Sequence, residues 1–457
     1  MPLSRRSVLC TLASGVLAGV SLLAPASSGA ASARAAYVPG EVVVRYAPEA
    51  GRSARAAAQR GTGTGEPRVF APRTRVLKIR DGESVAETVG ELRRRPGVLS
   101  ATPNHIARAS AFVPNDPGDG AGWQNLQWNF NPGAGVNAPD AWERLNVVGR
   151  PGGLGVKVAV LDTGVAYATR RRFQRSPDLA GNRFLKGYDF VDRDAFPDDH
   201  NGHGTHVAST IAETTGNGYG VTGLAYGARL MPVRVLDRFG AGDSVAISAG
   251  IRYAARRGAK VINLSFEFCD GSDPQCPAVT ASDVPDVIDA VRYARSKGAL
   301  VVAAAGNTSN RRAVAYPARV SRVLSVGATT EYSCLASFSS GGAGLDLVAP
   351  GGGPDANIPG DPNCQNGRAG RDIFQITFDE GSVRTFGLPD DYEGTSMAAP
   401  HVSATAALIV ASGVIGANPT PSAIEARLKN TARDLGPAGR DERYGAGLID
   451  AARAVTP

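Results

Sequence analysis

Short apolar runs alternate with longer segments of helical periodicity over most of the chain. The runs expected to be strands are Val156–Leu161, Arg229–Leu236, Lys260–Ser265, Leu300–Ala305, Val323–Val326 and Leu345–Val348. The helices between them are expected to begin near His203, Ser244, Val284, Ser396 and Ser422. Strands alternating with helices are typical of a parallel sheet that has helices on both faces. The pattern therefore predicts an α/β domain with three layers.

A different order of elements precedes this domain. Period-2 alternation predicts strands at Glu41–Tyr46 and Arg75–Ile79, and closing strands within Gly97–Ala107. Helices are predicted at Ala50–Gln59 and at Ser84–Arg95, where Ser84 and Glu87 have the spacing of a capping box. We expect residues 37–108 to form a separate small α+β module of ferredoxin-like type.

The last apolar segment begins with a serine. The run Ser403–Ala411 is small and apolar on every face, which predicts a helix buried on all sides. Ser396 is expected at its start, where unpaired N–H groups favour negative charge, and Pro400 in its first turn, where a missing N–H costs little. A serine at such a position often does no more than cap the helix.

Two further motifs change this interpretation. Asp162 ends the apolar run that begins at Val158, and His203 opens a second helix of small residues. Asp162, His203 and Ser396, in this order and each inside its own glycine-bounded motif, resemble the three signatures of the subtilisin-like serine proteases, the subtilases. The resemblance implies that Asp162 orients an imidazole, that His203 is the general base and acid, and that Ser396 is the nucleophile. The same resemblance implies that His206 has only a structural role.

Two other classes of site were weighed against this one. Gly394–Ala398 is close to the nucleophile elbow of an α/β-hydrolase, but that class needs an acid and a histidine downstream, and only His401 follows. The second alternative is a metal site formed by His203 and His206 together with Asp198 and Asp199. No third ligand stands at a usual spacing, and the subtilase motif explains both histidines.

The subtilase resemblance also implies further site residues. Asn307, after Ala303–Gly306, would share the oxyanion with the Ser396 N–H, as in relatives of this family. The loop with Gly240 and Gly242 would pair with an extended substrate backbone, unless its glycines only make a turn. In the family, Val261–Ser265 is followed by Leu-Gly-Gly, and those bare glycines form the wall of the substrate pocket.

Here the wall departs from the family. It reads Phe266-Glu267-Phe268 after Ser265, so side chains should narrow the pocket. If the Glu267 carboxylate points inward, it would favour Arg or Lys before the cleaved bond, and if it points to solvent, the preference stays apolar or small. Strand alternation is compatible with either. The chain between Ala349 and Ser396 is also unusually long, with a hairpin expected from Asp372–Phe378 and Val383–Phe386.

Charge and composition change the picture in one respect. The 457 residues are 43% hydrophobic and 20% charged, which is ordinary for a globular protein with a sizeable core. The net charge of +7 is concentrated in residues 1–108, which hold 16 basic and 7 acidic residues, so the rest of the chain is slightly acidic. No nucleic-acid partner is implied.

The first residues are typical of an export signal. Arg5 and Arg6 precede an apolar stretch to Leu23 and a tract of small residues, which predicts a signal peptide over residues 1–33, cleaved after Ala30 or Ala33. The paired arginines resemble a twin-arginine leader, although ordinary export fits as well. The signal is too short and too serine-rich for a membrane anchor.

The module at residues 37–108 resembles the inhibitory prosegment of subtilases, although a separate binding module is the alternative. The resemblance implies a secreted, monomeric endopeptidase that hydrolyses peptides through an acyl-enzyme. It would be made as a zymogen, inhibited by its own prosegment and cut by itself between Ala107 and Asp116. The peptidase domain is expected at residues 112–457. A catalytically silent, peptide-binding relative of subtilases is the alternative from another class.

Cysteines and calcium complete the predictions. Cys10 should leave with the leader, and the four remaining cysteines allow three pairings, of which we favour Cys269–Cys276 with Cys334–Cys364. In relatives with the same Pro-Asn-Asp-Pro start, a structural Ca²⁺ ties the mature N-terminus to two loops. The matching positions are Asp116, Asp178 and Asn217, and a weaker second ion could use Asp189 and Asp194. No cofactor is expected for catalysis.

Overall fold

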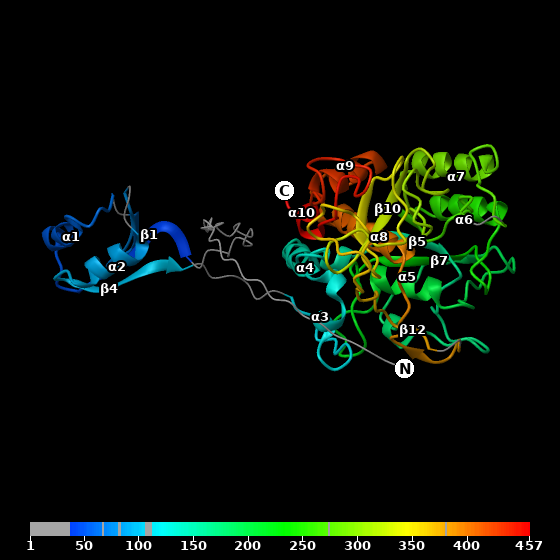
Figure 1. Ribbon diagram of the computed structural model, residues 1–457. Coiled ribbons are helices and arrows are strands. Elements are labelled where there is room, and N and C mark those ends of the chain that lie inside the picture. Colours follow the sequence, from blue (N-terminus) through cyan, green and yellow to red (C-terminus); the bar gives the residue numbers. More distant parts are fainter. Residues whose placement is uncertain (1–36, 66–67, 81–83, 106–111, 273–274, 380–381) are drawn as a thin grey trace, which may run out of the picture. The chain divides into compact units, whose positions relative to one another are not determined.

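The structure is a computed structural model in which the chain forms two compact units, Met1–Ser110 and Ala111–Pro457 (Figure 1). It describes residues 37–457 except 66–67, 81–83, 106–111, 273–274 and 380–381. The predicted signal peptide and residues 107–111 of the predicted cleavage region lie outside the described residues.

The first unit is a four-stranded antiparallel sheet with two helices, which confirms the predicted α+β module, although the closing strands predicted within Gly97–Ala107 form one strand. The strands are β1 (Tyr37–Tyr46), β2 (Arg68–Ala71), β3 (Thr74–Lys78) and β4 (Val98–His105), in the order β2-β3-β1-β4. The helices are α1 (Arg52–Gln59) and α2 (Val85–Arg93). The capping box is confirmed, because the Ser84 hydroxyl accepts from the Glu87 N–H while Glu87 accepts from the Ser84 N–H. The short strand β2 was not predicted.

The second unit is built on a seven-stranded parallel sheet with the order β11-β10-β9-β8-β5-β7-β6. Its strands are β5 (Lys157–Asp162), β6 (Tyr188–Asp189), β7 (Arg229–Arg234), β8 (Val261–Leu264), β9 (Leu300–Ala304), β10 (Val323–Thr329) and β11 (Leu347–Pro350). All six predicted strands are confirmed, and the two-residue β6 is added at one edge. The α/β fold class is therefore confirmed.

Helices cover both faces of this sheet. One hydrophobic core holds residues of α4 (Ala138–Val147), α5 (His203–Ala212), α8 (Thr395–Ser412), α9 (Pro421–Thr431) and α10 (Ala451–Val455). A second core, on the other face, holds residues of α6 (Ser244–Arg256) and α7 (Pro285–Ser296). Alternate residues of one strand go to the two cores, as Val158 and Val160 do to the first and Ala159 and Leu161 to the second. The remaining short helical turns are α3 (Trp123–Leu126), η1 (Trp128–Phe130), η2 (Pro151–Gly153) and η3 (Pro177–Leu179).

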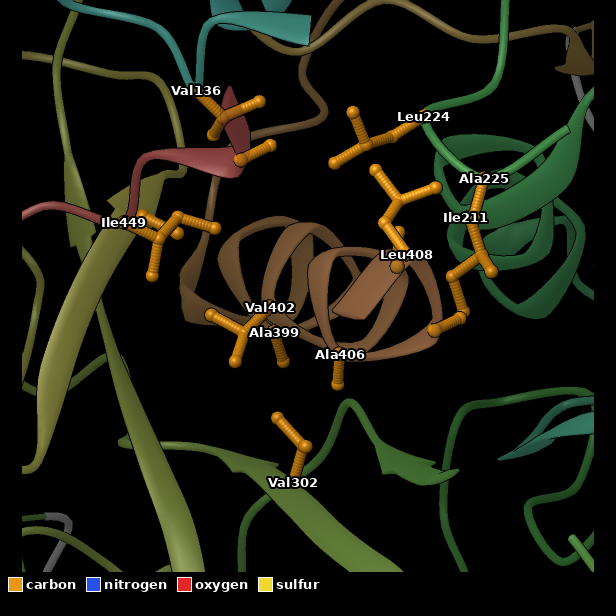
Figure 2. Packing of buried hydrophobic residues seen from close by; sticks show 14 of the residues in the cluster. Val136, Ile211, Leu224, Ala225, Val302, Ala399, Val402, Ala406, Leu408 and Ile449 are labelled. Carbon is orange, nitrogen blue, oxygen red and sulfur yellow. The ribbon is translucent and has the colours of Figure 1, made fainter. Parts of the chain in front are cut away.

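Helix α8 runs through the middle of the first core. Figure 2 shows it with Val302 of β9 on one side and with Val136, Leu224 and Ile449 around the others. Its residues from Thr395 to Ile409 are all buried, which confirms the prediction of a helix enclosed on every side. Small side chains such as Ala406 make this close approach possible. Within the described residues, no helix combines the length and the apolar character that a membrane span requires.

The prediction for Pro400 was wrong. The helix begins at Thr395, so Pro400 lies in its second turn, where an N–H would ordinarily bond to the Ser396 carbonyl. That carbonyl instead accepts a hydrogen bond of 2.8 Å from the Ser265 hydroxyl. The proline therefore leaves the Ser396 carbonyl free to tie the start of α8 to the segment after β8.

The long segment before Ser396 forms a smaller hairpin than predicted. Only β12 (Thr377–Phe378) and β13 (Phe386–Gly387) pair, antiparallel, with Phe378 opposite Phe386. The predicted strand residues 372–376 do not belong to it, because Ile373 and Ile376 use their carbonyls to accept from the His206 ring and the Ser209 hydroxyl of α5. The disulfides Cys269–Cys276 and Cys334–Cys364 are both present, as predicted.

Candidate active site

The predicted site residues come from the carboxyl-terminal edge of the parallel sheet. Asp162 is the last residue of β5, Ser265 follows β8 and Asn307 lies shortly after β9. Parallel strands place their carboxyl ends along one edge, which is where such folds form their sites. Ser396 faces this edge from the first turn of α8, and His203 from the first turn of α5. A cavity of about 370 Å³ is lined by His203, Ser265, Asn307 and Ser396, among others.

A hydrogen bond joins the buried Asp162 to His203, which lines the cavity. The His203 Nδ1 lies 2.7 Å from the Asp162 Oδ1, which also accepts from the Thr163 N–H. Because an ionised carboxylate only accepts, the Nδ1 carries the proton and the Nε2 keeps its lone pair. Burial acts to lower the pKa of His203, but the charge of Asp162 and this hydrogen bond outweigh it, so the pKa lies above its usual value. The pair is therefore a base held in one tautomer.

Ser396 lies in the same cavity with its hydroxyl donating to the Ser265 carbonyl at 3.0 Å. Ser265 thus binds Ser396 twice, because its own hydroxyl donates to the Ser396 carbonyl. These bonds fix the position of the helix start beside His203. A serine hydroxyl rotates freely about its Cβ–Oγ bond, so it can turn from the Ser265 carbonyl to the imidazole when a substrate enters.

The side chain of Asn307 is fixed with its nitrogen free. Its Oδ1 accepts from the Thr395 N–H at 2.8 Å and from the Thr395 hydroxyl at 2.9 Å. Since a backbone N–H always donates, the accepting atom is the oxygen, and the Nδ2 is left to donate elsewhere. A methyl group built on Gly394 would lie 3.6 Å from both this nitrogen and the Ser396 backbone nitrogen. The two donors therefore border one small space.

The other histidines near the site are buried and neutral. The His206 Nε2 donates to the Ile373 carbonyl, and burial lowers its pKa to about 3. The His401 Nδ1 donates to the Met397 carbonyl, and burial lowers its pKa to about 4. Asp198 pairs with Arg170, and Asp199 accepts from N–H and O–H groups. The part of the chain that the structure describes contains no group of three His, Cys, Asp or Glu side chains placed to hold a metal.

Gly240 and Gly242 lie in the loop before α6. Gly240 has a positive φ of 80°, has open space where a Cβ would be and lines the cavity. A Cβ on Gly242 would come within 2.3 Å of the Val235 carbonyl oxygen, so this glycine is required by close packing. The loop belongs to no strand. On the opposite wall, Phe266 and Glu267 also line the cavity.

The three predicted calcium ligands lie together, where the start of the second unit meets the later segments that hold Asp178 and Asn217. The buried Asp116 accepts from the N–H groups of Gly216 and Asn217, and the Asn217 side chain donates to the buried Asp178 at 2.7 Å. Burial raises the pKa of Asp178 to about 7. Glu213, which the sequence did not single out, is a third buried acid beside them, and burial and the charge of Asp178 raise its pKa.

The second group of acids is already paired. Arg234 binds Asp189 at 2.8 Å and Asp192 at 2.7 Å, and the Asp194 carboxylate accepts from the Phe196 N–H. The Arg234 guanidinium therefore already neutralises the Asp189 carboxylate, which was a predicted ligand of the second calcium ion. The geometry does not favour the second ion.

The segment before Ser396 supports helix α5, which begins with His203, and this role was not predicted. The Thr377 hydroxyl donates to the carbonyl of Gly202, which precedes His203. The Tyr392 ring stacks on the His206 ring with centroids 4.1 Å apart. Spacing along the chain carries no signal for such contacts, because the partners are more than 150 residues apart.

Two parts of the chain match known protein families. The subtilase family matches residues 153–447, which include Asp162, His203, Asn307 and Ser396. The fervidolysin N-terminal prodomain matches residues 24–104, which include the first unit's sheet up to most of β4.

Individual proteins agree with these matches. The chain is 36% identical to a thermophilic serine proteinase of Bacillus sp. (strain AK1) over 386 residues, which cover 83% of this chain and 80% of the relative. It is 34% identical to thermitase of Thermoactinomyces vulgaris, over 75% of this chain and 99% of thermitase. Among solved structures, a protease from Pseudoalteromonas arctica superposes with a TM-score of 0.58 at 31% identity, covering 75% of this chain and 99% of the other.

Proposed function

The chain belongs to the subtilase family and is a subtilisin-like serine endopeptidase with an N-terminal prodomain, and from this premise we propose that Asp162, His203 and Ser396 are its catalytic triad. The observation that carries the assignment is the 2.7 Å hydrogen bond between the Asp162 carboxylate and the His203 ring, in the cavity that Ser396 also lines.

The reaction proceeds in two steps. The His203 Nε2 removes the proton of the Ser396 hydroxyl while its oxygen attacks the substrate carbonyl, and the imidazolium then protonates the leaving amine. An acyl-enzyme on Ser396 remains, and water, activated by the same imidazole, hydrolyses it. Asp162 stabilises the imidazolium by its charge and keeps the ring in position. Ser265 holds the start of α8 throughout.

Negative charge on the carbonyl oxygen is stabilised by two donors, the Asn307 side-chain nitrogen and the Ser396 backbone N–H. The bonds from Thr395 orient the Asn307 amide before the substrate arrives, so no reorganisation is needed in the transition state. The positive end of the α8 dipole acts in the same direction.

Substrates are extended peptide chains that lie along the loop of Gly240 and Gly242. The open space at Gly240 lets a backbone approach the loop closely, which supports recognition by strand-like hydrogen bonds. The residue before the cleaved bond meets the wall formed by Ser265, Phe266 and Glu267.

The protein is made as a secreted zymogen. Residues 1–33 are a signal peptide, residues 37–108 inhibit the enzyme within the same chain, and residues 112–457 remain as a monomeric peptidase after autoprocessing. The match of residues 24–104 to a prodomain supports this division. So does the excess of basic residues in the part that is removed.

A structural Ca²⁺ binds to Asp116, Asp178 and Asn217. The donor set fits, because carboxylate and amide oxygens are the ligands that Ca²⁺ prefers. None of the ion pairs among the described residues involves Asp116 or Asp178, although both carboxylates are buried. The nearby Glu213 Oε2 is buried without a hydrogen-bond partner, so one more oxygen at this place is available to a cation. The ion would tie the start of the peptidase domain to two later loops.

The full-length chain and its Ser396→Ala variant test this function together. Mass spectrometry of the purified wild type should show a cut between Ala107 and Asp116, and an activity assay should show that it hydrolyses casein. The variant should show neither the cut nor the hydrolysis. A full-length wild-type chain that hydrolyses no protein would contradict the proposal, as would an active Ser396→Ala variant.

A further inference from the structure

The wall that follows β8 contains Glu267, the one carboxylate among the described residues that line the cavity beside the nucleophile. Twelve described residues line this cavity, among them His203, Glu267, Asn307 and Ser396. None of them is Lys or Arg. The charge of Glu267 is therefore not balanced by a cation of the cavity itself.

The Glu267 carboxylate points inward, across the cavity. Its two oxygens lie 3.0 and 3.2 Å from the backbone nitrogen of Asn307, which donates to them. A Cβ on Gly306 would lie 2.3 Å from the Glu267 Oε2, so the side chain uses the room that this glycine leaves. The two orientations that the sequence left open are thus decided in favour of the inward one.

Asn307 also relates Glu267 to the cleaved bond. The backbone nitrogen of Asn307 holds the carboxylate, and its side-chain nitrogen borders the space for the substrate carbonyl. The side chain that belongs to this carbonyl is the one before the cleaved bond, so it enters the cavity next to Glu267.

The charges around Glu267 are few. Asp270, on the same segment, adds negative charge, and its own carboxylate accepts from Asn310 and from the hydroxyl of Thr308. His203 lines the cavity and bears a positive charge only when protonated. Among the described residues, no ion pair includes Glu267, and the Asn307 N–H is its one recorded donor. The remaining lone pairs of the carboxylate are available to a ligand.

We propose that Glu267 makes this peptidase select substrates with Lys or Arg immediately before the cleaved bond. This rests on the proposed function, since it assigns the substrate class of the same site. A partly buried carboxylate has lost part of its hydration. A substrate ammonium or guanidinium compensates for this loss by donating a charge-assisted hydrogen bond to the carboxylate. A neutral side chain of equal length displaces water from the carboxylate and offers no charge.

The test compares peptides that differ only in the residue before the cleaved bond, with Lys, Arg, Gln or Ala at that position. At pH 8 the mature enzyme should cleave the Lys and Arg peptides with a kcat/KM about tenfold to a hundredfold above that of the Gln peptide. In Glu267→Gln this ratio should fall to near one. Asp270→Asn removes the same charge nearby without touching the cavity, and should keep the preference.

The unmodified enzyme provides a second test that does not depend on the folding of a variant. Burial, together with the charge of Asp270, raises the pKa of Glu267 to about 6. The carboxylate is ionised above this pH and protonated below it, so the ratio of Lys to Gln cleavage should fall between pH 7 and pH 5. Titration of His203 slows both peptides equally and cancels in the ratio.

Three outcomes overturn the inference. One is equal cleavage of the Lys and Gln peptides by the wild type. The second is a preference for Lys that Glu267→Gln retains. The third is a wild type that cleaves fastest after Ala and a Glu267→Ala variant that accepts a wider range of residues before the cleaved bond. Glu267 would then act only by filling space. Hydrolysis of casein by the wild type, lost in Ser396→Ala, shows that the proposed function stands even when this inference fails.

Discussion

At the scale of single residues, the hydrogen bond between Asp162 and His203 governs how activity depends on pH. The base must be neutral to accept the Ser396 proton, and it must hold that proton firmly enough to deliver it to the leaving amine. The buried carboxylate of Asp162 serves the second requirement, because its charge and its hydrogen bond raise the pKa of His203. The cost is activity lost at mildly acidic pH.

The first prediction follows from this shift. For a peptide with a neutral residue before the cleaved bond, kcat/KM should fall as pH decreases through a pKa that lies above the ordinary histidine value of 6.5. Asp162→Asn should lower kcat by about 10⁴-fold, because the favoured tautomer is lost. A profile that stays level from pH 8 to below 6 would show that His203 is not the base.

The second prediction concerns the oxyanion donors. Asn307→Ala should lower kcat by about 10²- to 10³-fold with little change in KM, because the donor acts mainly in the transition state; the magnitude is that of the equivalent donor in a subtilisin, a relative. Asn310→Ala, in the same loop but outside the cavity, is the matched control. A rise in KM at constant kcat in Asn307→Ala would instead indicate a role in substrate binding.

Sequence motifs predicted which residues form the site better than they predicted the direction in which a side chain points. The sequence singled out Asp162, His203, Asn307 and Ser396. In the structure the last three line one cavity and Asp162 binds His203, because the glycines near them allow tight turns that few other residues can adopt. The direction of Glu267 could not be predicted, because β8 ends at Leu264 and strand alternation no longer applies beyond it. Gly306, about forty residues further along the chain, decides it.

At the scale of elements, α8 places the nucleophile by being packed on every side. Ala406 points toward Val302 of the sheet, and Leu408 toward Leu224 and Ile211 (Figure 2). A helix held in this way cannot shift to relieve strain. Its first turn, with Ser396, therefore keeps its position relative to β8 and β9.

The third prediction tests this packing. Ala406→Leu should destabilise the protein by about 1–3 kcal/mol, since the added carbon atoms must displace Val302 or the helix itself. Ala426→Leu, on the exposed side of α9, should change stability by less than about 0.5 kcal/mol. Urea unfolding of the two variants in the Ser396→Ala background, which prevents self-digestion, measures both. Equal stability of the two would contradict the enclosed position of α8.

The elements that the sequence predicted wrongly involve partners distant along the chain. The periodicity of 372–378 predicted a long strand, but Ile373 and Ile376 bind α5 instead of a neighbouring strand. Pro400 was expected in the first turn because a proline usually breaks a helix further in. The Ser265 hydroxyl, more than a hundred residues away, satisfies the carbonyl that the proline leaves unpaired.

At the scale of the whole molecule, the acids at the start of the peptidase domain connect segments that are far apart in sequence. Asp116 binds the loop of Gly216 and Asn217, and Asn217 binds Asp178. The buried Glu213 lies near Asp178, and burial together with the charge of Asp178 raises the pKa of Glu213. A cation that binds only the folded state would stabilise this arrangement by mass action.

The fourth prediction is that calcium raises thermal stability. At a free Ca²⁺ concentration 100 times the dissociation constant, the gain is about 2.7 kcal/mol, which a chelator should remove with a fall in Tm of several degrees. Asp178→Asn should lose most of this response, whereas Asp189→Asn should retain it, because Asp189 already binds Arg234. The same Tm with and without a chelator would rule out the site.

The catalytic role of Ser396 can be measured directly by covalent labelling of the mature enzyme with a sulfonyl fluoride. We expect one label per molecule, located by mass spectrometry on Ser396, and a loss of peptide hydrolysis in proportion to the labelling. His203→Ala, which lacks the base, should label far more slowly. Full activity after complete labelling, or a label on a different serine that accounts for the loss, would contradict the assignment of Ser396 as the nucleophile.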